Sequence, residues 1–554
     1  MSTSKYLPWI VGIMFLLAAG ISIFLFIRPG EAKETLARKE VSYEDLFAEG
    51  QIMDVNVVID EESFQELIEN PMAEQYVNCH VEINGEMYYH VGLRTKGNTS
   101  LSQVASSDSD RYSFKIEFDH YQEGQTMEGL DKLILNNIFS DKTYVKEYMA
   151  YDIFHYMGVA APYTCFANIS FNGEKWGLYL AIEGMEEAFA QRVYGLDYGQ
   201  LYKPESEMGF GGGPFGPDGE ETYGGADLVY NGEEEENYKD IFDNASFDIR
   251  KEDKTRLINA LKYINAGEEL EKYMDVEQCL RYFAAQTFIV NLDSYYSNLK
   301  HNYYLYEKDG QLTILPWDLN LAFGGFQARD AKDAVNNPID TPMTGISESQ
   351  RPLFSKLMDV EEYKEKYHSY LREIGEEYVY SGKAALKLKE IKTLISPYVK
   401  EDPTAFYTYE EFLTGIESLE AFILARADSV LGQLDGVIPS TQEGQKEEEG
   451  KLVEAKSISL QDMGVQGGGN MGDGPERGRP PMKRDFEPGL EGAFPKGMER
   501  GNMPPGMPRQ EDEGMEKSFV FLGTSIVAIV WGILVVFFLP RQKMNVHKKK
   551  KNIA

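Results

Sequence analysis

The residues best suited to chemistry lie between positions 291 and 325. Four of them carry carboxylate or amide oxygens: Asp293, Asn298, Asn302 and Asp318. Such oxygens are the ligands that hard cations such as Mg²⁺ prefer. Phosphoryl transfer needs a carboxylate that orients the attacking hydroxyl, together with an Asp and an Asn that hold a metal ion. The residue types of this segment therefore fit a phosphoryl-transfer site.

A hairpin is expected to bring these residues together. Asp309-Gly310 stands between two strand-like runs, and an Asp-Gly pair in that setting is a strong signal for a two-residue turn. Such a turn pairs Asn302 with Trp317 and His301 with Asp318. The polar residues then gather at the open end of one hairpin. Asp and Asn are also common turn and capping residues, which is the alternative explanation for their presence.

The spacing of two of these residues strengthens the chemical argument. Asp293 and Asn298 have the separation found in the catalytic loop of protein kinases, where the Asp is the base and the Asn binds metal. Asp318 follows the next hairpin, where kinases carry a second metal-binding Asp. Asn298 fits the spacing and Asn302 fits the approach to the strand, so both are candidates for the metal.

Several upstream residues could bind a nucleotide. Arg94 and Lys96 lie in a Gly-containing turn, whose backbone N–H groups and cations could cradle phosphates. Lys115 lies on the polar face of a predicted strand over residues 113–118, like the phosphate-binding Lys of kinases. Glu147 follows on a predicted helix, where kinases carry the Glu that pairs with this Lys. Each of them is alternatively a solvated surface charge.

The run over residues 176–185 reads as a strand followed by a helix. It corresponds in order to the kinase hinge, where backbone groups meet adenine, and Glu183 lies within it. The alternative is a buried edge strand. The order of the elements is more informative than any one of them, because consistency across several levels is stronger than a single match.

Composition excludes several classes of protein. The chain has 554 residues with 55 Lys and Arg against 90 Asp and Glu, a net charge of −35, which argues against a nucleic-acid partner. Its hydrophobic content of 42% and aromatic content of 12% suffice for a folded core. Three cysteines cannot form a disulfide scaffold, so we expect buried free thiols.

Two uncharged runs, residues 7–27 and 519–539, are each long enough to cross a hydrocarbon core of about 30 Å. The second follows acidic residues 511–513 and precedes the basic run 548–551. Positive charge stays in the cytoplasm, so the C-terminal tail is expected there. We expect the globular domain outside the cell membrane, tethered at both ends. A cleaved signal peptide is the alternative for the first run.

Between these runs the chain reads as a sheet-rich half followed by a helical half. Further hairpin turns are expected at Asn84-Gly85 and Asn172-Gly173. Helices are expected over residues 144–156, 254–264, 276–290, 360–378, 384–398 and 409–434. This order indicates an α+β chain of two lobes. A Gly-rich run from Gly209 reads as a surface loop, and the Gly/Pro/Met-rich stretch after about residue 440 reads as a linker.

Taken together, these residues resemble the spore-coat protein H (CotH) kinase family. The resemblance rests on residues 92–97, 112–118, 177–179, 183, 291–295, 301–304, 316–320 and 323–324. It implies that Asp293 is the catalytic Asp and Asp318 the metal-binding Asp. It also implies an ion pair between Lys115 and Glu147. The family often has Asp where this chain has Asn320, which leaves Asp318 as the intact metal-binding carboxylate.

The resemblance implies a divergent protein-kinase-like fold of two lobes, here with a transmembrane helix at each end. The expected parts are an N-terminal anchor and stalk (1–40), an N-lobe-like region (41–200), a C-lobe-like region (201–440), a linker (441–517), and a C-terminal transmembrane helix with a basic tail (518–554). The cofactors would be ATP and Mg²⁺ or Mn²⁺.

The implied activity is phosphorylation of Ser or Thr on spore-coat or cell-envelope proteins. An alternative is a surface adhesin or scaffold that keeps the kinase-like fold without transferring phosphate, which the acidic surface and long linker would suit. A glycan acceptor is a third possibility, because the sequence does not reveal an acceptor site. Nucleotide binding separates the first two.

Overall fold

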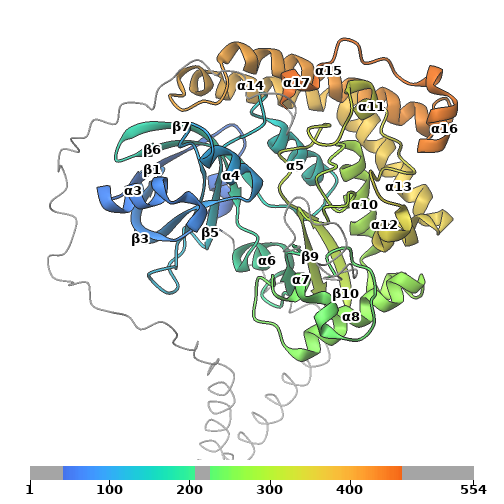
Figure 1. Cartoon of the computed structure of the whole chain (residues 1–554), viewed down its shortest axis with the longest axis horizontal. Coiled ribbons are helices and arrows are strands. Elements are labelled where there is room, and N and C mark those ends of the chain that lie inside the picture. Colours follow the sequence, from blue (N-terminus) through green and yellow to red (C-terminus); the bar gives the residue numbers. More distant parts are fainter. Residues whose placement is uncertain (1–41, 206–224, 465–554) are drawn as a thin grey trace, which may run out of the picture. The chain divides into compact units, whose positions relative to one another are not determined.

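The computed structural model describes residues 42–205 and 225–464 (Figure 1). Seven strands form a closed barrel in the order β1-β2-β3-β4-β5-β7-β6. They are β1 (Ile52–Val58), β2 (Val77–Ile83), β3 (Glu86–Lys96), β4 (Ser113–Glu117), β5 (Lys132–Asn136), β6 (Thr164–Phe171) and β7 (Glu174–Glu183). Strands β1 and β6 run parallel and close the barrel, whereas the other neighbours are antiparallel.

Alternation along the strands divides their side chains between two cores. Phe114, Ile116 and Leu133 belong to the core that fills the barrel. Ile134 packs in the second core, which the barrel shares with the helices. Because successive residues of a strand point to opposite faces, Lys115 lies with Ile134 on the outer face of the barrel. The polar face predicted for residues 113–118 is therefore the face turned away from the barrel interior.

The three predicted hairpins are confirmed. Asn84-Gly85 joins β2 to β3, and Asn172-Gly173 joins β6 to β7. Asp309-Gly310 joins β9 (Tyr303–Lys308) to β10 (Gln311–Pro316), and Tyr303 lies opposite Pro316, in the register that the two-residue turn predicts. With β8 (Gln200–Tyr202), these two strands form a separate sheet in the order β10-β9-β8.

Helices make up most of the rest. The α-helices are α3 (Glu61–Glu69), α4 (Thr99–Ala105), α5 (Lys146–Tyr156), α6 (Glu187–Tyr194), α7 (Lys239–Phe242), α8 (Lys251–Ala266), α9 (Leu270–Tyr273), α10 (Val276–Phe288), α11 (Ala331–Val335), α12 (Pro352–Met358), α13 (Glu361–Glu373), α14 (Lys383–Glu401), α15 (Tyr409–Leu434), α16 (Gln442–Glu447) and α17 (Leu460–Met463). Short 3₁₀ helices are η1 (Ser42–Phe47), η2 (Pro71–Ala73), η3 (Glu235–Tyr238), η4 (Glu348–Gln350) and η6 (Glu449–Lys451), and η5 (Ile374–Tyr380) is a π-helix.

Helix α5 lies between the barrel and α10 (Figure 1). Cys79, Cys165 and Cys279 are buried and free, as expected.

The closed barrel corrects the predicted fold class. The sequence predicts a divergent kinase-like fold of two lobes, whereas the structure has a seven-stranded closed barrel packed on helices. The closing pair joins residues far apart in the chain, with Ile52 opposite Phe166. Local sequence patterns reveal strands and tight turns, but they do not reveal which distant strands pair. The barrel is for that reason absent from the prediction.

The membrane prediction is corrected as well. Across residues 42–205 and 225–464, no helix combines the length and the apolar character needed to cross a membrane. The two predicted spans, residues 7–27 and 519–539, lie outside the described residues, as do residues 206–224 of the Gly-rich run. The described residues therefore give no support to the prediction of a membrane-anchored protein located at the cell membrane.

A buried ion pair fastens the barrel to the helical part. Arg111 precedes β4, and its Nη1 lies 2.9 Å from Oδ2 of Asp402, which follows α14. Both side chains are almost completely buried. The same Oδ2 accepts a hydrogen bond from the backbone N–H of Leu178 at 2.8 Å. A Cβ at Gly177 would lie 2.6 Å from Asp402 Oδ1, so this anchor explains why a glycine stands there.

We expect Asp402→Asn to lower the free energy of unfolding by about 3–5 kcal/mol, because it leaves the buried guanidinium of Arg111 without its counter-charge. Chemical denaturation measures this. The matched control is Asp435→Asn, which removes a carboxylate from the exposed pair with Arg372. It should cost less than about 1 kcal/mol. Equal losses in the two variants would contradict a specific role of the buried pair.

Candidate functional site

One cavity is lined by most of the residues that the sequence singled out. Its volume is about 710 Å³, and its lining comes from the outer face of the barrel and from the loops that flank β9 and β10. The barrel contributes Arg94, Lys96, Lys115, Lys132 and Asn136. The other side contributes Asp293, His301, Asn302, Asp318 and Asn320, and α5 contributes Glu147. Cations and carboxylates therefore line the same cavity.

The strand register places the cationic side chains of the barrel on neighbouring strands. Arg94 on β3 lies opposite Lys115 on β4, which lies opposite Ile134 on β5. Lys132 precedes Ile134 by two positions and so shares its face. Glu186 Oε1 lies 3.8 Å from the Nζ of Lys115 and 3.0 Å from the Nζ of Lys132. Burial and the charge of Lys132 lower the pKa of Lys115 to about 8, although Glu186 opposes this.

Lys96, rather than Lys115, is linked to Glu147. Lys96 Nζ donates to Asn136 Oδ1 at 3.0 Å, and Asn136 Nδ2 donates to Glu147 Oε2 at 2.9 Å. In the part of the chain that the structure describes, the ion-pair partner of Lys115 is Glu186, so the expected pair of Lys115 with Glu147 is not formed. Burial of Glu147 and the neighbouring charge of Asp318 raise the pKa of Glu147.

Asp318 follows β10 in a left-handed backbone conformation with φ of 54°. Its backbone N–H donates to the Tyr151 hydroxyl at 3.2 Å, and the next N–H, of Leu319, donates to Glu147 Oε1 at 3.3 Å. These two bonds tie the turn after β10 to α5. The Asp318 charge helps to raise the pKa of both Glu147 and His301.

Asp293 lies in the segment between α10 and β9, with 8% of its surface exposed. His301 Nε2 donates to Asp293 Oδ1 at 2.6 Å, and Asn302 Nδ2 donates to Oδ2 at 2.9 Å. Asn302 Nδ2 also lies 3.0 Å from the Asp293 carbonyl oxygen. Two neighbouring residues thus hold both carboxylate oxygens. Each oxygen keeps a lone pair that can accept a hydrogen bond from a substrate hydroxyl.

His301 is the site residue that sequence reasoning missed. Burial opposes the charge on its imidazole, but the hydrogen bond and charge of Asp293, with the charges of Asp318 and Glu205, raise its pKa. The signal in the sequence was the hairpin register, which places His301 opposite Asp318. Contact with Asp293, eight residues earlier, depends on the loop conformation between them.

The structure separates the two Asn candidates for a metal. Asn302 lines the cavity beside Asp293, whereas Asn298 is exposed and is not among the residues that line it. The Asn298 side-chain oxygen accepts a hydrogen bond from Gln327 at 3.5 Å. Of the two, Asn302 is therefore the residue brought to the carboxylates.

Two expected nucleotide-binding residues have ion-pair partners of their own. Arg94 lines the cavity and pairs with Glu74. Glu183 is fully buried, pairs with Arg192 at 2.6 Å and accepts a hydrogen bond from the Tyr43 hydroxyl at 2.6 Å. Glu183 is not among the residues that line the cavity. Its contacts join η1 and α6 to the end of β7, which is a structural role.

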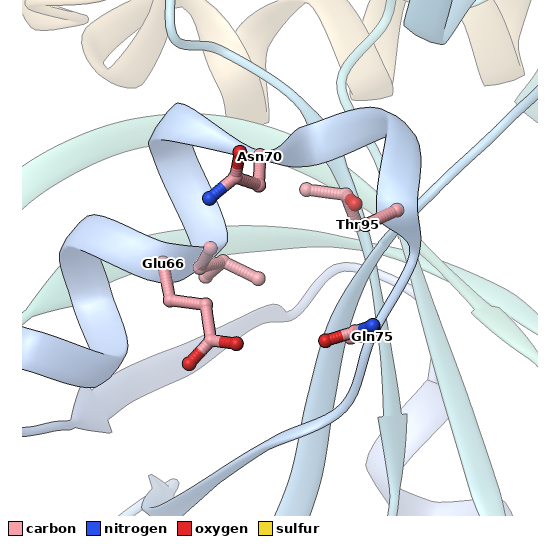
Figure 2. A pocket seen from close by; sticks show the side chains of 6 residues that line it. Glu66, Asn70, Gln75 and Thr95 are labelled. Carbon is pink, nitrogen blue, oxygen red and sulfur yellow. The ribbon is translucent and has the colours of Figure 1, made fainter.

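A smaller cavity of about 270 Å³ lies near the end of β3. Figure 2 shows Glu66, Asn70, Gln75 and Thr95 around it. The Thr95 hydroxyl donates to the carbonyl oxygen of Pro71 at 2.6 Å, so this region holds the strand end that carries Arg94 and Lys96. The residues lining the small cavity include no Lys or Arg. Of the two cavities, the larger one has the cations that a phosphate group would need.

The donor set of the larger cavity fits a metal ion that arrives with phosphate. Among the described residues, no group of three or more His, Cys, Asp or Glu could hold a metal ion. Mg²⁺ is usually held by one or two carboxylates together with phosphate oxygens and water. Asp318 and Asn302 offer such a partial set. The repulsion between Asp318 and Glu147 is also what a divalent cation would relieve.

Comparison with known proteins identifies the family of this chain. Residues 93–430, which include the four barrel cations and Glu147, Asp293, His301, Asn302 and Asp318 of the larger cavity, match the family described as CotH kinase protein. Inner spore coat protein H of Bacillus subtilis (strain 168) is 24% identical over 309 residues, which are 55% of this chain and 78% of that protein. A relative named for the spore coat gives no support to a location at the cell membrane. Because the family match spans more than half of the chain, this protein belongs to the CotH kinase protein family.

Proposed function

We propose that this protein is an atypical protein kinase that transfers the γ-phosphate of ATP to Ser or Thr of a spore-coat or cell-envelope protein. One observation carries the proposal: four cations of the barrel line the same cavity as the hydrogen-bonded carboxylate of Asp293. Phosphoryl transfer relies mainly on positioning and on stabilising negative charge. Family membership supports kinase chemistry, and the name of the relative supports a coat protein as the acceptor.

In the proposed reaction, Asp293 is the catalytic residue. The acceptor hydroxyl oxygen forms a bond to the γ-phosphorus, while the bond from that phosphorus to the bridging oxygen breaks and ADP leaves with the electron pair. The hydroxyl proton moves to the Asp293 carboxylate, which His301 and Asn302 hold in place. Arg94, Lys96, Lys115 and Lys132 would bind the phosphates from the barrel side.

Asp318 and Asn302 would hold a divalent metal ion, Mg²⁺ or Mn²⁺. When bound, such an ion neutralises charge on the phosphate oxygens. Glu147 supports this arrangement from α5, because its two oxygens accept hydrogen bonds from Asn136 on the barrel wall and from Leu319 beside Asp318. Glu147 therefore connects the cationic wall to the metal-binding turn.

The direct test is phosphate transfer by the purified full-length protein. It uses radiolabelled ATP, with Mg²⁺ and Mn²⁺ in turn, and a Ser-rich protein acceptor. Label on Ser or Thr supports a kinase. ATP binding without transfer to this or to coat-protein acceptors would favour a glycan or a more specific acceptor. If the protein neither binds ATP nor transfers phosphate, the kinase proposal is overturned in favour of a scaffold or adhesin.

We expect ATP affinity to fall as pH rises through about 8, the pKa to which burial and Lys132 lower the Lys115 ammonium. Below that pH Lys115 is charged and attracts the phosphates, and above it the attraction is lost. Lys115→Arg keeps its charge throughout this range, because an Arg side chain stays protonated. Calorimetric titration of ATP between about pH 6.5 and 9.5, roughly 1.5 pH units on each side of the Lys115 pKa, measures the effect.

The control for this experiment is Lys175→Arg, which changes an exposed lysine paired with Glu401 outside the cavity lining. This variant should keep the pH dependence of the unmodified protein. An identical pH dependence in Lys115→Arg and in the unmodified protein would show that Lys115 does not bind phosphate.

A further inference from the structure

The last described residues, 452–464, form a tail segment beyond the family match, which ends at residue 430. The sequence predicts a flexible linker over residues 441–517, which includes this segment. Instead, α17 packs against α15 (Figure 1). The side chains of Ala455, Ile458, Leu460 and Met463 are buried and belong to the main core. The tail segment is therefore part of the folded domain.

The tail segment is held by the turn that begins α5. The backbone N–H of Lys142 donates to the Met463 carbonyl oxygen at 3.2 Å. The Lys146 ammonium donates to the carbonyl oxygens of Gly464 at 2.8 Å and Ser140 at 3.2 Å. Lys146 is completely buried. A buried ammonium is costly unless polar groups surround it. The charge of the buried Asp141 carboxylate favours the Lys146 ammonium, and the tail segment adds a carbonyl oxygen that accepts its hydrogen bond.

Two glycines allow this close contact. A Cβ at Gly464 would lie 2.5 Å from the Ser140 carbonyl oxygen, and a Cβ at Gly415 of α15 would lie 2.8 Å from the Asp462 carbonyl oxygen. Between α15 and the tail segment, Ser418 Oγ also accepts from the Ser459 N–H and donates to the Ser459 carbonyl, both at 3.0 Å. The backbones therefore touch over several points rather than through one flexible side chain.

The same turn leads directly into the candidate site. Lys146 is the first residue of α5, and the next residue is Glu147. Glu147 holds Asn136 of the barrel wall and the N–H of Leu319 beside Asp318. We propose that Lys146 and the tail segment are positioning elements of the nucleotide site, acting through Glu147. This inference rests on the proposed function, because it concerns the site proposed to bind ATP.

The test compares Gly464→Ala with Gly450→Ala in the full-length protein. Gly464 has a φ of 86° and no room for a Cβ, whereas Gly450 has nothing within 4 Å of a Cβ. Hydrogen exchange is followed in peptides covering residues 140–151 and 316–321, at a temperature where both variants are folded. We expect faster exchange in both peptides for Gly464→Ala only. ATP affinity should also fall, by about 10-fold to 100-fold, since small misplacements at a site cost this much.

Gly415→Ala is the second variant. It replaces a glycine inside a helix by a better helix former, yet its Cβ would meet the tail segment and the backbone of Lys142 and Thr143, in the turn before α5. It should also speed exchange at residues 316–321. Faster exchange confined to residues 459–464, with unchanged ATP affinity, would overturn the positioning role and leave a purely structural contact. If the unmodified protein does not bind ATP, the proposed function fails, while the exchange at residues 316–321 still decides the positioning claim.

Discussion

Asp293→Asn is expected to lower phosphate transfer by about 10²-fold to 10⁴-fold, the usual contribution of a positioned acid–base group. The substitution keeps the shape of the side chain but removes the charge that accepts the hydroxyl proton. ATP binding should change little, because the four cations of the barrel wall and Asp318 remain. Single-turnover transfer with labelled ATP, together with a separate ATP titration, measures both effects.

The matched control is Asp309→Asn, the same chemical change at the far end of the β9–β10 hairpin. Asp309 is exposed and occupies a turn position that Asn adopts equally well. This variant should transfer phosphate like the unmodified protein. Transfer by Asp293→Asn within a few-fold of the control would exclude Asp293 as the catalytic base.

Asp318→Asn should strongly weaken metal-dependent ATP binding. Loss of a metal-binding carboxylate weakens such a site by about 100-fold or more. At an ATP concentration 100 times the dissociation constant, binding stabilises the unmodified protein by about 2.7 kcal/mol, and a 100-fold weaker site leaves about 0.4 kcal/mol. Thermal unfolding with and without ATP and Mg²⁺ or Mn²⁺ measures this difference.

The unliganded Asp318→Asn protein should be as stable as the unmodified protein or more stable. Asp318 lies near the buried carboxyl of Glu147 and raises its pKa, so removing the Asp318 charge removes a repulsion. A lost ATP response then cannot be attributed to unfolding. An unchanged response to ATP and metal in Asp318→Asn would show that the metal is held elsewhere.

The β9–β10 hairpin shows how much local sequence can predict. The Asp-Gly turn sets the register, and the structure has that register along the whole hairpin. Turn chemistry alone therefore places Asn302 and Asp318 at the same end of the hairpin. Helix α15 spans the predicted residues 409–434, because Thr408 and Glu411 form a capping box at its start.

The pairing of the cations could not be predicted in the same way. Alternation along β4 places Lys115 on the outer face of the barrel, but it does not say which acid will face it. In the folded chain Glu186 lies beside Lys115, while Lys96 reaches Glu147 through Asn136. The positions of Glu147 and Glu186 depend on how α5 and the start of α6 pack against the barrel.

The sequence by itself determined the hairpins, the main helices and the residue types of the site, because short-range turn chemistry and periodicity encode them. Only the tertiary structure decided that β1 and β6 close a barrel, that His301 holds Asp293, and that the tail segment reaches Lys146. Each of these contacts depends on loop conformation or long-range packing. Such contacts are set by the energy of the whole fold, which no local pattern contains.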